Sequence, residues 1–227
     1  LRGGHRSLGQ PTDRAAASAC VGSDAKKKLT RPSQQQREDV VIERRAYSEQ
    51  MKSFDAARLV FVDESGVVQG MRLGYGYAPR GVRCVENAPF RVGKRQSLIG
   101  WMAADGGEIV RLEGSVTAEV FERFVRQDLV PSLEPGDIVI WDNARIHSAE
   151  AVRLIEQAGA RVVPLPRYSP EYNAIELMWS KLKHYVRKLR ADTAEALRRA
   201  LEEAVTFLRA DDARAWIEHC GYQFLPN

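Results

Sequence analysis

Three acidic residues occupy positions from which they could share metal ions. Asp63 is expected to close the strand "LVFVD", Asp142 to close the strand "IVIWD", and Glu176 to open a helix. An aspartate directly after an apolar strand is costly to bury unless it meets water, a donor or a cation. Three carboxylates at one edge of a sheet would repel one another and bind hard cations through oxygen. Two such ions about 3.5–4 Å apart would activate an attacking oxygen and stabilise a leaving oxygen at phosphorus.

Each of these residues also has a purely structural interpretation. Asn173 and Glu176 have the spacing of a capping box, with the asparagine as N-cap. Asp63 could be a turn residue in "VDESG", and Asp142 with Asn143 could form a loop that caps the next helix. Both interpretations of each residue stay open at this point.

Three side chains close to these carboxylates in the sequence are not counted among the metal ligands. Glu64 follows Asp63 directly, so it should point to the opposite face of the strand, and it is left out of the site. His147 could be a base or a metal ligand, but a helix-edge or packing histidine is favoured. Trp179 follows Glu176 by three residues and is expected to pack as core or as a wall of the site.

The composition is that of a globular protein. A chain of 227 residues that is 44% hydrophobic suits one generous domain, or one domain with an appendage. No apolar run approaches the ~18 residues of a membrane span, so no membrane partner is expected. Three cysteines, Cys20, Cys84 and Cys220, lack paired spacing, which argues against a zinc site and fits a cytoplasmic protein.

Basic residues are concentrated near the N-terminal end. Residues 1–58 hold twelve Lys and Arg against seven Asp and Glu, whereas the whole chain holds 34 against 30. A second basic run, "KLKHYVRKLR", follows Glu176. Such runs attract nucleic acid, although each could equally be a solvated tail or a solvated helix face.

The remaining patterns predict an α/β fold with a mixed sheet flanked by helices. Strands are expected in "RLVFVDESG", in both halves of "QSLIGWMAADGGEIVRLEG", in "DIVIW" and in "ARVVPLP". Helices are expected in "TAEVFERFVRQDLV" with Thr117 as N-cap, in "AEAVRLIEQAG" closed by Gly159, after Glu176, and over 193–209 and 211–219. We predict a disordered or remnant basic arm over 1–32, a linking helix over 33–57, and one domain over 58–227.

Four blocks of the sequence resemble the catalytic domain of DDE transposases, and more narrowly the bacterial insertion-sequence transposases related to mariner elements. The blocks are "LVFVDESG", "GYGYAPRG", "VIWDNARIHSA" and "RYSPEYNAIELMWSKLK", and the resemblance covers about residues 58–215. It implies a ribonuclease H-like fold and a DDE catalytic domain over 58–227. The family's two aspartates fall on Asp63 and Asp142, and its glutamate falls on Glu176, 34 positions after the second aspartate.

The resemblance also implies a reaction and its participants. Two Mg²⁺ or Mn²⁺ ions held by Asp63, Asp142 and Glu176 would activate water for cleavage at a transposon end. They would then activate the freed 3′-hydroxyl for attack on target DNA. The implied partners are DNA and a second copy of the chain in a homodimer, in the cytoplasm and on the nucleoid when bound to DNA. Asn143 and Asn173 are expected to hydrogen-bond near the metal ligands, and the expected DNA contacts are Arg167, Lys181, Lys183, Arg187 and Lys188.

The N-terminal stretch departs from the family pattern. Such proteins carry helix-turn-helix units ahead of the catalytic domain, whereas residues 1–32 show no pair of amphipathic helices. Two alternatives to a transposase therefore stay open. The chain could be a truncated remnant that binds DNA without cutting it, or a ribonuclease H-like nuclease that only hydrolyses DNA.

Overall fold

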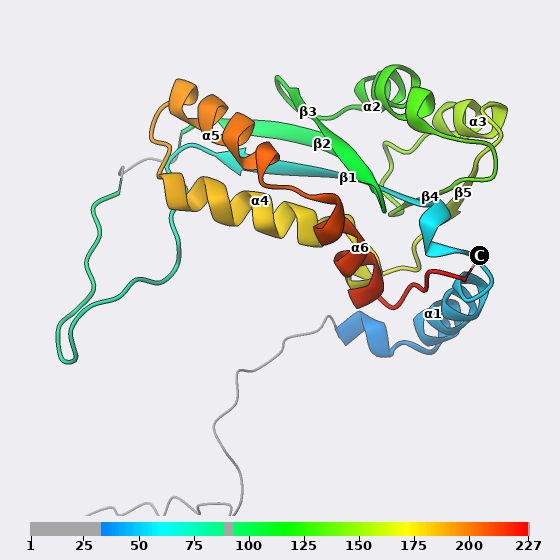
Figure 1. Ribbon diagram of the computed structural model, residues 1–227, viewed down its shortest axis with the longest axis horizontal. Helices are drawn as coiled ribbons and strands as arrows, with labels where there is room; N and C mark the ends of the chain where they lie inside the picture. Colours follow the sequence, from blue (N-terminus) through cyan, green and yellow to red (C-terminus); the bar gives the residue numbers. More distant parts are fainter. Residues whose placement is uncertain (1–32, 89–92, 227) are drawn as a thin grey trace, which may run out of the picture. The chain divides into compact units, whose positions relative to one another are not determined.

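The centre of the molecule is a five-stranded mixed sheet (Figure 1). The computed structural model describes residues 33–88 and 93–226, so the predicted arm over 1–32 lies outside the described residues. The strands stand in the order β3-β2-β1-β4-β5; β1, β2 and β3 pair antiparallel, whereas β4 and β5 run parallel to β1. This arrangement confirms the predicted mixed sheet. The strand bounds are β1 Leu59–Val68, β2 Arg95–Ala103, β3 Gly106–Leu112, β4 Ile138–Trp141 and β5 Arg161–Pro164.

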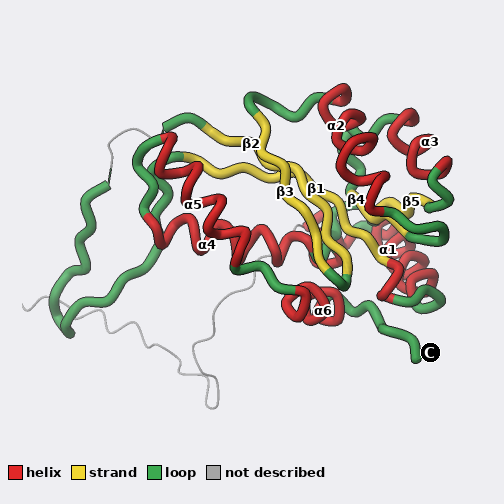
Figure 2. The backbone as a smooth tube through the Cα atoms, turned by 45° about the horizontal axis from the view of Figure 1, so that its top comes forward, coloured by secondary structure: helices red, strands yellow, loops and turns green. Residues whose placement is uncertain are grey.

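Helices cover both faces of the sheet, as Figure 2 shows. Alternate residues of β1 separate the two cores: Leu59 and Phe61 belong to one, and Val60 and Val62 to the other. The first core is closed by α1 (Glu38–Met51), α4 (Ile175–Leu189), α5 (Ala194–Thr206) and α6 (Ala210–His219). The second is closed by α2 (Ala118–Phe124) and α3 (Ala149–Gln157).

Local sequence explains how several of these helices begin and end. The Thr117 side chain accepts a hydrogen bond from the Val120 amide at 3.3 Å, which confirms the predicted N-cap of α2. Gly159 follows α3 with a φ of 84°, which an L side chain rarely adopts. The helix predicted over "TAEVFERFVRQDLV" is not uniform. After Phe124 it continues as a π-helical turn over Val125–Leu129 and a 3₁₀ turn over Val130–Ser132, where Pro131 lacks the amide that an α-helix requires.

The segment predicted as a linking helix over 33–57 packs into the first core. It forms a 3₁₀ turn over Ser33–Gln36 and the helix α1, and its Tyr47 and Met51 are buried. The Tyr47 hydroxyl lies 2.8 Å from the Tyr222 hydroxyl, and Tyr222 donates to the Tyr172 carbonyl at 2.6 Å. Helix α1, the C-terminal segment and the loop before α4 are therefore joined by one pair of hydroxyls.

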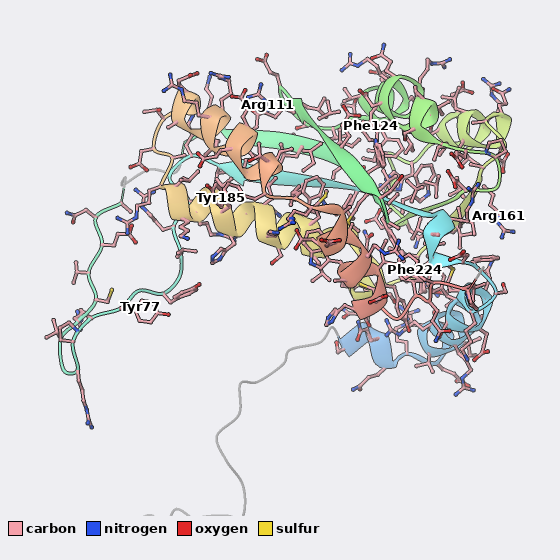
Figure 3. The ribbon with its side chains drawn as sticks, in the orientation of Figure 1. Tyr77, Arg111, Phe124, Arg161, Tyr185 and Phe224 are labelled. Atoms are coloured by element: carbon pink, nitrogen blue, oxygen red, sulfur yellow. The ribbon has the colours of Figure 1, made fainter. Side chains whose placement is uncertain are left out.

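A long loop connects β1 to β2. Tyr77, labelled in Figure 3, lies on this loop and is 96% exposed. At the base of the loop, the Arg72 guanidinium contacts Asp192 at 2.8 Å and Glu86 at 3.3 Å. The stretch "GYGYAPRG" is a loop, as predicted. Among the described residues, no helix has the length and apolar character needed to span a membrane.

Candidate active site

Asp63, Asp142 and Glu176 line one cavity, although they come from three separate elements. Asp63 lies on β1, Asp142 directly follows β4, and Glu176 lies in the first turn of α4. The rest of the wall is formed by the segments that follow β4 and β5. These further lining residues are Asn143, Ala144, Leu165, Pro166, Arg167, Tyr168, Ser169, Pro170 and Asn173. The structure therefore brings the three predicted carboxylates together.

Asp63 lies in the middle of β1 and does not end the strand, so the sequence-based prediction of its place was wrong. It pairs with Gly100 of β2, and the ladder continues to Val68 opposite Arg95. The turn interpretation of Asp63 is therefore also wrong. Strand alternation places Asp63 on the same face as Phe61, toward α4, and Glu64 on the opposite face.

Trp179 holds the Asp63 carboxylate. Its indole Nε1 donates to Oδ2 of Asp63 at 3.0 Å, and the Trp179 side chain is only 1% exposed. A Cβ added at Gly100 would lie 3.1 Å from Cη2 of this indole, so the ring lies against the strand neighbour of Asp63. The sequence predicted Trp179 as core or as a wall of the site; it belongs to the first core, and its hydrogen bond to Asp63 was not predicted.

The charge balance of the cavity is unfavourable for Asp63. Burial raises the pKa of Asp63 to about 8, and the negative charges of Glu176, Glu64 and Asp142 act in the same direction. Like charges around a partly buried carboxyl favour its protonated form. Perturbed carboxyls of this kind occur at functional sites more often than elsewhere.

Asp142 is exposed to solvent beside the cavity. Its side chain is 53% exposed, and Oδ1 accepts a hydrogen bond from the Ala144 amide at 2.8 Å. Helix α3 is capped by Ser148, whose hydroxyl accepts from the Ala151 amide at 3.2 Å. The interpretation of Asp142 as the cap of the following helix is therefore wrong. Asn143 donates to the Leu165 carbonyl at 2.6 Å and ties the ends of β4 and β5 together.

Glu176 does not form a capping box with Asn173. Helix α4 begins after Ala174 without a side-chain cap. The Asn173 Oδ1 atom is buried and has no hydrogen-bond partner among the described residues. The Glu176 side chain is exposed and likewise makes no hydrogen bond in the part of the chain that the structure describes. Its carboxylate is therefore available to a ligand in the cavity.

His147 packs behind the Asp142 backbone. Its side chain is 4% exposed, and its ring stacks on Trp141 with centroids 4.8 Å apart. Nδ1 lies 2.8 Å from the Asp142 carbonyl oxygen, and Nε2 lies 3.2 Å from Oε1 of Glu64. Burial acts to lower the pKa of His147, but its contacts with Glu64 and the Asp142 carbonyl outweigh burial and raise that pKa. His147 is therefore packed in the core, as the favoured interpretation expected, and it also makes two specific hydrogen bonds.

The basic residues predicted to contact DNA have different surroundings. Arg167 lies at the cavity, where its guanidinium contacts Asp39 at 2.8 Å and Glu43 at 2.6 Å. Lys181 contacts Asp212 at 2.5 Å. Three further basic residues of α4 form no ion pair with any described residue; they are Lys183, Arg187 and Lys188. Arg167 is the member of this set that lines the carboxylate cavity.

The donor set fits a hard divalent cation in its chemistry. Carboxylate oxygens are the ligands that Mg²⁺ and Mn²⁺ prefer, and all three acidic side chains reach the same cavity. Within residues 33–88 and 93–226, no group of three or more His, Cys, Asp or Glu is already arranged to hold an ion. Asp142 and Glu176 are both exposed, so neither side chain is held in place by surrounding core residues.

Comparisons with known proteins agree with this fold. A family model described as DDE superfamily endonuclease matches residues 58–198. The Mos1 transposase paired-end complex with the left transposon end is similar in structure, with a TM-score of 0.68 and 22% identity over 90% of this chain and 69% of that chain. The Mos1 mariner paired-end complex with Mn gives a TM-score of 0.68 and 24% identity, over 88% of this chain and 64% of that one.

The isolated catalytic domain of Mos1 mariner transposase matches at a TM-score of 0.57 and 19% identity, over 86% of this chain and 92% of that chain. At these identities the solved structures show a shared ribonuclease H-like fold. No curated protein matches the chain. Because the family model spans most of the sheet and its flanking helices, the chain belongs to the DDE superfamily endonucleases and has the fold of the mariner transposases.

Proposed function

We propose that the chain is a metal-dependent DNA transposase that cleaves DNA at the ends of an insertion sequence and joins those ends to target DNA. One observation carries the proposal: Asp63, Asp142 and Glu176, from three separate elements, line one cavity. The pKa of Asp63 is raised first by burial and then by the other carboxylates. Ionised carboxylates this close together repel one another unless a cation is bound between them. Carboxyls with such perturbed pKa values are typical of functional sites.

The side chains of the cavity have distinct roles in this proposal. Asp63, Asp142 and Glu176 would hold two Mg²⁺ or Mn²⁺ ions. When bound, such ions activate an attacking oxygen and stabilise the leaving oxygen at phosphorus. Trp179 orients one oxygen of Asp63, and Asn143 fixes the loop beside Asp142. Outer partners of this kind orient metal ligands.

DNA is the proposed substrate, and the basic side chains support this choice. Arg167 lies at the cavity and could exchange its carboxylate partners for a phosphate. Lys183, Arg187 and Lys188 extend the positive charge along α4. The similar Mos1 structures include complexes with a transposon end and with Mn or Mg. We extend DNA, the cations and a homodimer that handles two ends to this chain as parts of the proposal.

Metal-dependent nicking of a supercoiled plasmid tests the catalytic part of the proposal. We expect Mn²⁺ or Mg²⁺ to support nicking by the native chain and not by Asp142→Asn or Glu176→Gln. Asp105→Asn and Glu156→Gln are matched controls, because both residues are exposed and lie outside the cavity. Nicking that survives in Asp142→Asn and Glu176→Gln would refute the three-carboxylate site. Binding of DNA without nicking would favour a non-catalytic remnant.

An endonuclease that only hydrolyses DNA is the second candidate, since endonuclease is the description of the matching family. A labelled duplex taken from the DNA that flanks the coding sequence separates the two functions. Transfer of the label to a target plasmid supports a transposase. Nicking without transfer of the label supports hydrolysis alone.

A further inference from the structure

The two aspartates stand at equivalent places on neighbouring parallel strands. The ladder between β1 and β4 runs from Leu59 opposite Ile138 to Phe61 opposite Ile140. Asp63 lies two residues beyond the last pair on β1, and Asp142 lies two residues beyond it on β4. Backbone pairing between these strands therefore ends just before the two carboxylates. Contacts outside this ladder therefore also bear on how far apart the two carboxylates lie.

Glu64 and His147 make such a contact. Glu64 follows Asp63 directly and points to the opposite face of the sheet, where its carboxylate lies 3.2 Å from Nε2 of His147. Nδ1 of the same ring lies 2.8 Å from the Asp142 carbonyl oxygen. A carbonyl oxygen can only accept, so Nδ1 donates to it. The path from Asp63 through Glu64 and His147 to Asp142 therefore contains one peptide bond and two hydrogen bonds.

The imidazole is held in place by its neighbours. His147 stacks on Trp141 at 4.8 Å and contacts the Phe121 ring at 4.5 Å between centroids. Both rings belong to the second core, and the His147 side chain is 4% exposed. The His147 ring cannot turn away without losing its contacts with these two aromatic side chains. The contact between Glu64 and His147 is therefore rigid enough to hold the Asp142 backbone at a fixed distance from Asp63.

We propose that Glu64 and His147 are positioning residues that fix the Asp142 backbone relative to Asp63 from the face of the sheet opposite the cavity. This inference rests on the proposed function, because the spacing of the two aspartates matters for ions shared between them. Neither residue lines the carboxylate cavity. Both therefore act through Asp142 and do not touch the reacting atoms.

Glu64→Gln is the main test, because it keeps the shape of the side chain and removes its charge. We expect the Kd for Mn²⁺, measured by calorimetry on the full chain, to rise about 10-fold or more, as is usual for partners behind metal ligands. In plasmid nicking, kcat should fall while KM for DNA stays unchanged. Glu122→Gln is the matched control on the same face: Glu122 accepts from the Ser148 hydroxyl at 2.5 Å and makes no contact with Asp142.

A second measurement needs no metal and again uses Glu64→Gln, because the His147 ring is buried and replacing it would also disturb the second core. In the metal-free chain we expect the amide NMR signals of Asn143 and Ala144 to shift in Glu64→Gln and to stay in place in Glu122→Gln. Unchanged signals together with an unchanged Mn²⁺ Kd would overturn the inference. A native chain that binds no Mn²⁺ would remove the proposed function, whereas the amide shifts would still decide whether Glu64 positions the Asp142 backbone.

Discussion

The indole Nε1 of Trp179 donates a hydrogen bond to Oδ2 of Asp63 at 3.0 Å. This contact joins α4, which carries Glu176, to β1, which carries Asp63. Because Trp179 is almost completely buried, its indole N–H is shielded from bulk water. The same indole lies against Gly100, the strand partner of Asp63. One aromatic side chain thus ties the strand that carries Asp63 to the helix that carries Glu176.

Trp179→Phe should destabilise the protein and lower its activity. The change leaves a partly buried carboxyl without its donor, which costs roughly 1–3 kcal/mol. Chemical denaturation measures this loss, and the nicking assay measures the activity. Trp101→Phe is the control, because the Trp101 Nε1 is buried without a partner among the described residues. Equal losses in the two variants would mean that ring volume matters and the hydrogen bond does not.

Gly100→Ala should destabilise the protein by steric conflict. The added Cβ would lie 2.7 Å from the Glu108 carbonyl oxygen and 3.1 Å from Cη2 of Trp179. Crowding of this kind in a packed core costs about 1–3 kcal/mol. Gly74→Ala is the comparison, since a Cβ there meets nothing within 4 Å. If the two variants melt at the same temperature, the backbone at Gly100 has moved to accept the methyl group.

The stability of the metal-free protein should fall as the pH rises from about 5 to about 8. The folded-state pKa of Asp63, about 8, lies above the ordinary value of 3.8. Between these values the unfolded chain releases a proton that the folded chain keeps, so rising pH favours unfolding. His147 has a raised pKa and contributes in the same direction.

Asp63→Asn should flatten this pH profile, because the variant side chain does not titrate. Thermal unfolding at several pH values, with and without Mn²⁺, provides the measurement. Mn²⁺ should stabilise the native chain most at the upper end of the range, where Asp63 ionises most readily. A metal-free profile that is the same in Asp63→Asn would show that Asp63 does not titrate in this window.

Glu43→Gln should increase binding to nonspecific duplex DNA. Glu43 contacts the Arg167 guanidinium at 2.6 Å, so the substitution leaves this arginine beside the cavity with Asp39 as its remaining acidic partner among the described residues. One additional phosphate contact should steepen the slope of log K against log salt by about one. Glu49→Gln on the same helix removes the same charge from an ion pair with Lys52 and is the control. Equal effects on binding would indicate general electrostatics, not release of Arg167.

The presence of the two strands that carry Asp63 and Asp142 could be predicted from sequence, whereas the end of the first strand and the contacts around the site could not. The apolar run "IVIWD" placed Asp142 correctly, because β4 does end at Trp141. The residues "DESG" resemble a strand end, yet β1 continues through them because β2 supplies pairing partners such as Leu98 opposite Ser65. That pairing comes from a segment more than thirty residues away, which local propensity does not describe.

Contacts between residues far apart in the sequence could not be predicted from local patterns either. Trp179 and Asp63 are 116 residues apart, and Arg167 and Glu43 are 124 residues apart. The capping box failed for a different reason. Asn173 ends a 3₁₀ turn over Pro170–Tyr172, and its side chain is buried in the wall of the cavity, away from the helix amides. Sequence spacing alone does not distinguish these two environments.

The hydroxyl pair of Tyr47 and Tyr222 has a consequence for synthesis of the chain. Tyr222 donates to the carbonyl of Tyr172, in the loop that leads to Glu176, and it is made 50 residues later. At a translation rate of about 5–20 residues per second, that gap lasts roughly 3–10 s. For most of this interval, from Glu176 onward, the nascent chain contains all three carboxylates but lacks this hydrogen bond to the loop. The loop that leads to Glu176 can therefore gain this hydrogen bond only after Tyr222 has been made.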